Sequence, residues 1–173
     1  NLLFAAQEIS KLPLVLDGVE LDEAALDSMT SDQARFSVFA LVDTALAGKT
    51  AESVRMLHGL QREGSEAILV NWALAREVRS LYPMSLEIAA GVDRKSVLQR
   101  HRVWRSRASC SSAALSRLNP NGLQALLQQL AHSDQVLKGQ RQAEGGIWAE
   151  LERAVLMLCG INVLQRKEAI TTE

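Results

Sequence analysis

The chain has 173 residues, enough for one large domain or two small ones and for a substantial hydrophobic core. Hydrophobic residues make up 47% of it and aromatic residues only 4%, and the apolar content is mainly Leu and Ala, which lose little rotamer freedom in helices. The net charge of −1 excludes a whole-molecule attraction to nucleic acid or to a membrane surface, so such binding would need a local basic patch. These features predict an all-α fold.

The cysteines and the hydropathy pattern favour a cytoplasmic protein. Cys110 and Cys159 are too far apart for a CxxC motif and are typical of free thiols in a reducing compartment. No stretch approaches the roughly 18 consecutive apolar residues of a membrane span. The chain begins at Asn1 without a charged leader, which we interpret as a cut inside a longer protein.

The first 34 residues predict a small helical portion. Apolar residues from Leu2 to Leu12 recur at helical spacing, and Pro13 should end this helix because its ring cannot continue the hydrogen-bond ladder. A short helix is expected from Asp22 to Met29. The polar run Thr30-Ser31-Asp32 then separates this portion from a longer helical array.

The array is predicted to begin with two helices that end at glycines. Gly48 is placed to terminate the first in a left-handed conformation, Thr50 to cap the second, and Gly64 to stop it. The inner face of the first is expected to carry Phe36, Phe39, Val42, Asp43 and Leu46, and that of the second Val54, Leu57 and Leu60.

A central helix is expected next, because the segment from Ala67 to Tyr82 is apolar most of the way round in its first half. The turns Asn119-Pro120-Asn121-Gly122 and Gly145-Gly146 separate the later helices. Helical spacing predicts these over Val97 to Arg107, Ser112 to Leu118, Leu123 to Leu137 and Ile147 to Leu158. The tail from Leu164 to Glu173 loses the periodicity and is predicted to be flexible.

The run from Asp43 to Thr50 ends like a phosphate-binding loop, Gly48-Lys49-Thr50. Such a loop needs a glycine where Asp43 stands and a strand leading into it. A helix leads in here, so we interpret the run as the end of one helix and the cap of the next.

No other motif predicts catalysis or a bound cofactor. The three histidines, His58, His101 and His132, are too far apart for metal-ligand spacing and are expected at the surface or at helix caps. The acidic pairs Asp22-Glu23 and Glu150-Glu152 are expected at helix N-termini or on solvated faces. We therefore expect no intrinsic enzymatic activity, no cofactor and no metal.

One basic cluster stands above this background, opposed in sequence only by Asp93. It consists of Arg94, Lys95, Arg100, His101, Arg102, Trp104, Arg105 and Arg107. Guanidinium groups bind phosphates bidentately, and an exposed indole can stack on an unpaired base. The alternative is that Trp104 belongs to the core and that the arginines pair with acidic neighbours. The residues alone leave both interpretations open.

Several stretches, in the same order along the chain, resemble the delta subunit of the bacterial DNA polymerase III clamp loader. They are Phe39 to Thr50, Leu57 to Glu66, His101-Arg102-Val103-Trp104, Ala114 to Leu118, Ile147 to Glu152 and Leu156 to Cys159. The resemblance implies that residues 1–34 are the remainder of an AAA+-type helical lid domain and residues 35–162 a helical collar domain, with 163–173 a flexible tail.

The resemblance also implies partners. The collar would pack against the gamma or tau and delta-prime subunits, within the DNA polymerase III holoenzyme. The sliding clamp would be gripped only by an N-terminal domain absent from this chain. ATP-hydrolysing relatives carry a phosphate-sensing arginine in a Gly-Ser-x-Arg pattern, and if Asn1 matches its serine, Leu3 stands at the arginine.

For DNA, the resemblance makes Trp104 a candidate for contacting primer-template DNA, with Arg100, Arg102, Arg105 and Arg107 as phosphate partners. A second aromatic contact of the family would fall in Lys138 to Gly146, which holds no aromatic residue and leaves Arg141 or Gln142 nearby. A different function remains open, namely a stand-alone helical module that binds single-stranded nucleic acid through the cluster around Trp104.

Overall fold

The computed structural model describes residues 37–161. The predictions for the lid portion, for Leu3 and for the C-terminal tail therefore lie outside the described residues. Within 37–161 all regular structure is helical, which confirms the all-α prediction. No helix in this part of the chain has both the length and the apolarity needed to cross a bilayer.

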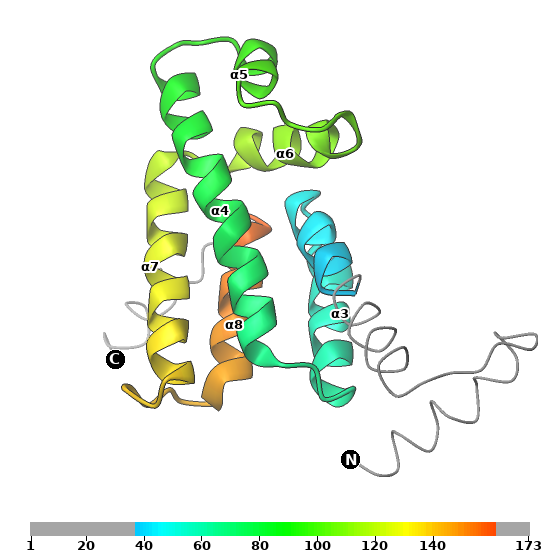
Figure 1. Cartoon of the computed structure of the whole chain (residues 1–173), viewed down its shortest axis with the longest axis vertical. Helices are drawn as coiled ribbons and strands as arrows, with labels where there is room; N and C mark the ends of the chain where they lie inside the picture. The colour runs from blue at the N-terminus through cyan, green and yellow to red at the C-terminus, as the bar shows by residue number, and fades with distance from the viewer. Residues whose placement is uncertain (1–36, 162–173) are drawn as a thin grey trace, which may run out of the picture. The chain divides into compact units, whose positions relative to one another are not determined.

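The described helices follow one another through short connections (Figure 1). After a helix over 37–46, they are α3 (Thr50–Arg62), α4 (Ala67–Ala89), α5 (Arg94–Arg100), α6 (Arg105–Arg117), α7 (Pro120–Leu137) and α8 (Gly146–Leu158).

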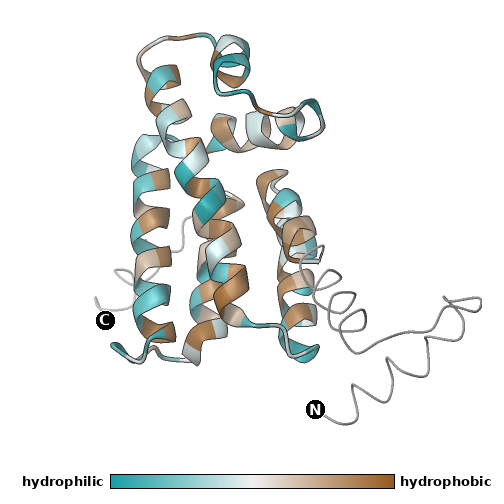
Figure 2. Ribbon diagram, in the orientation of Figure 1, coloured by the Kyte–Doolittle hydropathy of each residue, from teal (hydrophilic) through white to brown (hydrophobic). Residues whose placement is uncertain are grey.

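The body of the fold is a bundle of α3, α4, α7 and α8, with the short α5 and α6 at one end (Figure 1). The most extensive packing joins α4 to α7 and α7 to α8, and α8 also touches α3. The apolar faces turn inward (Figure 2). The larger fully buried side chains of these helices are Leu57, Leu74, Leu81, Leu123, Leu126, Leu151 and Leu158.

Local signals set the start of α7. The Asn119 side chain accepts a hydrogen bond from the Gly122 N–H at 2.8 Å, and Pro120 occupies the first turn, where no N–H donor is needed. The predicted end of the 37–46 helix is confirmed, since Gly48 has φ +80°. The cap of α3 is Lys49 rather than the predicted Thr50, which is the first helical residue.

The central helix is longer than the predicted Ala67 to Tyr82. It continues through Pro83 to Ala89. Pro83 removes one intrahelical donor, but it lies on the exposed side of α4, where water can serve the carbonyl that this donor would have bonded. Val70, Ala73 and Leu74 are buried in the first half, but Ile68 and Trp72 are exposed there. The expectation that neighbours surround this half is therefore wrong on the side of Ile68 and Trp72.

The predicted inner faces of the first two helices were partly wrong. Phe39 is exposed, because the buried side of its helix is instead made by Val38, Leu41, Val42, Ala45 and Leu46. In α3 the buried position that was expected for Val54 is taken by Ser53, which is fully buried. Val54 itself is only partly covered. The Ser53 hydroxyl is satisfied by donating to the Lys49 carbonyl at 2.9 Å.

Candidate nucleic-acid interface

The predicted single helix over Val97 to Arg107 is wrong, because the chain breaks it at His101 and restarts at Arg105. The N–H of Arg102 bonds the Gln99 carbonyl and that of Val103 bonds the Leu98 carbonyl, both at 3.0 Å. This pair of bonds is the Schellman arrangement, which requires a left-handed residue after the cap. Arg102 supplies it, with φ +52°.

The predicted separate helix over Ser112 to Leu118 is also wrong. The segment belongs to α6, which runs from Arg105 to Arg117. Gln99, Arg102 and Arg105 therefore do not share one helical face, as a continuous helix would have required.

Trp104 is strongly exposed by this geometry. It precedes α6 in an extended conformation, with φ −59° and ψ +141°, and 80% of the residue is open to solvent. Val103 and Leu98, by contrast, pack against the core. The alternative in which Trp104 belongs to the core is therefore wrong.

The other end of α5 is fixed by Asp93. Its carboxylate accepts from the Ser96 N–H at 3.0 Å and from the Ser96 hydroxyl at 3.1 Å. These two bonds lower the pKa of Asp93. Asp93 therefore acts as a helix cap, and the acids that oppose the basic cluster come from other helices.

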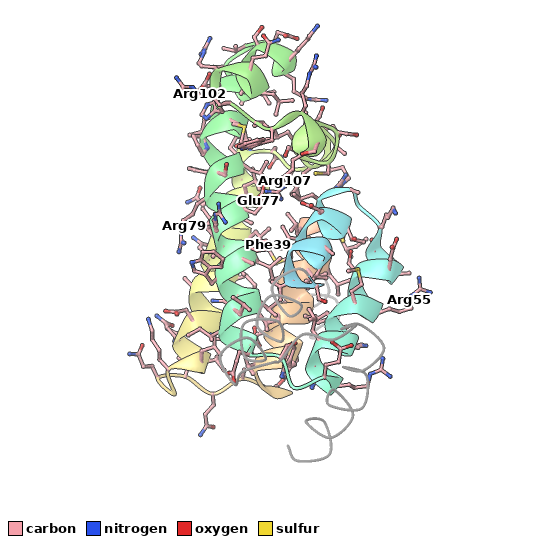
Figure 3. The ribbon with its side chains drawn as sticks, turned by 45° about the vertical axis from the view of Figure 1, so that its right-hand side comes forward. Phe39, Arg55, Glu77, Arg79, Arg102 and Arg107 are labelled. Atoms are coloured by element: carbon pink, nitrogen blue, oxygen red, sulfur yellow. The ribbon has the colours of Figure 1, made fainter. Side chains whose placement is uncertain are left out.

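Arg107 is engaged by two of these acids (Figure 3). Its guanidinium donates to Asp43 Oδ1 at 2.6 Å and to Glu77 Oε2 at 2.9 Å, joining α6 to the 37–46 helix and to α4. Burial lowers the pKa of Arg107, but the two carboxylates outweigh this effect and the pKa is raised overall. Arg107 is thus built into the fold.

Arg100 is engaged in a similar way at the far end of α4. It donates to Glu87 Oε2 at 2.6 Å, and His101 Nε2 lies 2.7 Å from Glu87 Oε1. The hydrogen bond with His101 is the largest influence that lowers the pKa of Glu87, and the Arg100 charge adds to it. The cluster is therefore opposed by Asp43, Glu77 and Glu87, and not by Asp93 alone.

Arg102 and Arg105 differ from these two arginines. Both are exposed, and neither forms an ion pair with any residue of the 37–161 region. Arg102 lies at the end of the molecule beyond α4 (Figure 3). Arg94 and Lys95 form no ion pair within this region either, but they lie at the start of α5. We call the exposed residues Arg102, Trp104 and Arg105, where α5 gives way to α6, the Trp104 patch.

The Arg117 side chain packs against the run that ends in Gly48-Lys49-Thr50 and resembles a phosphate-binding loop. Arg117 donates to the Leu46 carbonyl at 2.7 Å, and its guanidinium lies 3.0 Å from where a Cβ on Gly48 would stand. Lys49 pairs with Glu52 at 3.2 Å. This geometry agrees with our interpretation of a helix end. The sequence analysis missed this role of Arg117, because the residues next to it in sequence give no sign that its guanidinium bonds a carbonyl 71 positions away.

Each of the three histidines lies near a glutamate carboxylate. His58 and His101 each lie 2.7 Å from a glutamate, Glu152 and Glu87 respectively, and His132 lies 3.8 Å from Glu150. The expected solvated position of Glu150 is wrong. It is buried, and it accepts from Gln129 at 2.6 Å and from Arg153 at 2.7 Å.

The described residues hold no group of three or more His, Cys, Asp or Glu side chains suited to a metal ion. Both cysteines are free thiols within this part of the chain. Burial raises the pKa of the Cys110 thiol, and Cys159 is buried. The raised pKa of Cys110 is the opposite of the depressed pKa of a reactive thiolate.

The described part of the chain belongs to the class of all-helical bundles, and the connection between α5 and α6 is basic and carries Trp104. The family model described as "Processivity clamp loader gamma complex DNA pol III C-term" matches residues 38–165. The chain belongs to this family, which confirms the resemblance found in the sequence.

Two relatives support the same assignment. The chain is 31% identical over 159 residues to the DNA polymerase III subunit delta of Escherichia coli (strain K12), covering 92% of this chain and 46% of that protein. It is 25% identical over 171 residues to the DNA polymerase III subunit delta of Haemophilus influenzae (strain ATCC 51907 / DSM 11121 / KW20 / Rd), covering 92% of this chain and 48% of that protein. The chain spans about half the length of these curated relatives.

Proposed function

We propose that this chain is the collar-bearing part of a clamp-loader delta subunit. In this proposal it scaffolds the loader by packing against gamma or tau and delta-prime subunits, and it carries no catalysis of its own. The observation that supports the proposal most directly is the family match, which extends over the whole described bundle. Residues 1–34 would be the remainder of the lid domain and 35–162 the collar.

Gel filtration tests the assembly. The purified chain is mixed at micromolar concentration with gamma or tau and delta-prime subunits, and it is expected to co-elute with them. A variant with a disrupted core, Leu126→Asp, should lose co-elution together with its helical circular dichroism signal, because it buries a charge at a position that is 1% exposed. Separate elution of the intact chain from all partners contradicts the proposal.

The second part of the proposed function is guidance of primer-template DNA by the Trp104 patch. Trp104 offers an indole face on which a base can stack, for about 1–3 kcal/mol. Arg102 and Arg105 offer guanidinium groups that need not break an ion pair within residues 37–161 to reach a phosphate. Arg100 and Arg107, which were predicted as further phosphate partners, would have to leave Glu87, Asp43 and Glu77 first.

Fluorescence anisotropy with labelled primer-template DNA tests this part. The double variant Trp104→Ala/Arg105→Ala is expected to bind at least tenfold more weakly. The matched control is Arg55→Ala/Arg62→Ala, which removes two exposed arginines from α3. Equal loss in both variants would mean that the patch carries no special role.

Gel filtration, together with the anisotropy measurement, separates the alternative function. A stand-alone module for single-stranded nucleic acid would bind DNA through Trp104 but would elute apart from gamma or tau and delta-prime. The Lys138 to Gly146 connection holds no aromatic residue, so we propose no second stacking contact there, although Arg141 and Gln142 are exposed.

A further inference from the structure

A groove of about 430 Å³ runs between α4 and α7, away from the Trp104 patch. Its α4 wall is formed by Ile68, Trp72, Ala75 and Arg79, and its α7 wall by Leu127, Ala131, Asp134 and Lys138. Each wall repeats at alternating intervals of four and three residues, which is one face of a helix. We call it the α4–α7 groove.

The groove exposes large apolar side chains that the bundle does not cover. Ile68 is 58% exposed and Trp72 is 48% exposed, and exposed Phe39 meets Trp72 edge to face, with ring centroids 6.5 Å apart. The small residues Ala75 and Ala131 lie between the larger ones on each wall. Side chains spaced in this way leave room for the ridge of a third helix, as helices pack against one another.

A polar group inside the groove is left without a partner. Asn71 is 6% exposed and lines the groove, and its side-chain oxygen accepts no hydrogen bond from residues 37–161. Its amide nitrogen is used, donating to the Leu130 carbonyl at 3.4 Å. A buried acceptor without a donor is unfavourable, so a donor brought by an occupant would be favoured here.

The charges at the rim select the chemistry of that occupant. Arg76 and Arg79 form no ion pair within the described part of the chain, whereas Asp134 is neutralised by Lys138 at 2.6 Å. Arg79 points away from the bundle (Figure 3). The rim is therefore net positive, and it complements acidic side chains.

A nucleic-acid strand fits this groove less well than a protein. Arg76 lies over the Trp72 ring, with its Cζ 5.5 Å from the centroid, and Phe39 packs on the same indole, so the ring is already used for stacking.

We infer that the α4–α7 groove receives an amphipathic helix of a neighbouring subunit, with apolar residues seated between Ile68 and Ala131 and acidic residues facing Arg76 and Arg79. The inference rests on the proposed assembly of the loader and names the surface and the partner chemistry within it. Helix-in-groove recognition of this kind depends on apolar anchors at helical spacing.

The test uses the full chain with a photo-crosslinking benzophenone side chain at position 68, mixed with purified gamma or tau and delta-prime subunits. Mass spectrometry is expected to place the crosslink in a helix of a partner where acidic residues flank apolar ones. The same side chain at position 55, on α3, serves as the control and should give no crosslink to that helix.

Charge reversal gives the second measurement. Arg76→Glu/Arg79→Glu is expected to weaken partner association at least tenfold, while Arg55→Glu/Arg62→Glu changes it less than twofold. An assembled complex with neither a crosslink at position 68 nor a response to reversal overturns the groove inference and leaves the proposed function standing. A crosslink to a second copy of this chain also overturns it, and failure of any complex to form overturns both.

Discussion

Arg102 occupies a backbone conformation that favours glycine, at the residue that ends α5. Replacing it by glycine removes strain of about 1–2 kcal/mol and adds about 0.5–1 kcal/mol of unfolded-state entropy. We therefore expect Arg102→Gly to leave the free energy of unfolding unchanged or to raise it by up to about 1 kcal/mol. Urea denaturation followed by circular dichroism measures this.

The same variant separates structure from DNA binding. If Arg102 contacts phosphate, Arg102→Gly should weaken DNA binding without loss of stability, and Arg102→Ala should weaken it equally while keeping the strain. A loss of stability above about 1 kcal/mol in the glycine variant would show that the Arg102 side chain is needed by the fold.

The side-chain oxygen of Asn71, which has no donor within residues 37–161, gives a second prediction about stability. Asn71→Leu keeps the approximate shape and removes a buried acceptor without a donor, together with a long hydrogen bond of 3.4 Å. We expect the free energy of unfolding to rise by about 1 kcal/mol in urea titrations. Asn71→Asp, which buries a charge at the same place, should lower it instead. If the leucine variant is destabilised, the Asn71 oxygen is satisfied in the free protein.

Among the helices, α6 is held to its neighbours by Arg107. Removing this side chain leaves Asp43 and Glu77 facing each other without a cation. Because the Arg107 side chain is 36% exposed and that of Asp43 is 47% exposed, solvent weakens these bonds, and Arg107→Ala should lower the free energy of unfolding by about 1–2 kcal/mol. The adjacent exposed Arg105→Ala should change it by less than about 0.5 kcal/mol. Equal effects would contradict the structural role of Arg107.

The contact of α4 with α5 should depend on pH through Glu87. Its pKa is lowered by the hydrogen bond with His101 and by Arg100, so the folded protein holds this carboxyl ionised to lower pH than the unfolded chain does. The resulting stability is present above the unfolded pKa of about 4.3 and is lost as pH falls through the lower folded value. In urea titrations from pH 6 to pH 3, Glu87→Gln should show a smaller acid-induced loss than the unaltered chain. An unchanged pH profile would remove Glu87 from the acid response.

The helices that the sequence predicted well are those whose signals are local. The Leu periodicity of α7 and the helix end at Gly48 depend on residues within a few positions of one another. The start of α7 was placed too late, at Leu123, because the run from Asn119 to Gly122 was predicted as a turn, whereas the helix begins at Pro120. The break at His101 was missed because the residue in the left-handed conformation, Arg102, is an arginine. Neither glycine nor proline marks the place.

The candidate site could be predicted only as a set of residues. The exposure of Trp104 follows from the break between α5 and α6, and the pairing of Arg107 follows from contacts with residues 64 and 30 positions away. Such contacts exist only after the helices pack. The sequence thus located the cluster and left open which of its arginines are free.

For the molecule as a whole, a net charge of −1 means that DNA binding has to come from a local patch. Each phosphate neutralised on a single strand contributes about −0.7 to the slope of log K against log salt concentration. With Arg102 and Arg105 as the two phosphate partners, we expect a slope near −1.4 for single-stranded DNA, measured by anisotropy between about 50 and 200 mM salt. Arg105→Ala should reduce its magnitude by about 0.7, and Trp104→Ala should weaken binding without changing the slope, because stacking releases no counterions. A much steeper slope would mean that Arg100 and Arg107 leave their carboxylates to bind DNA, and Arg107→Ala would then reduce it as well.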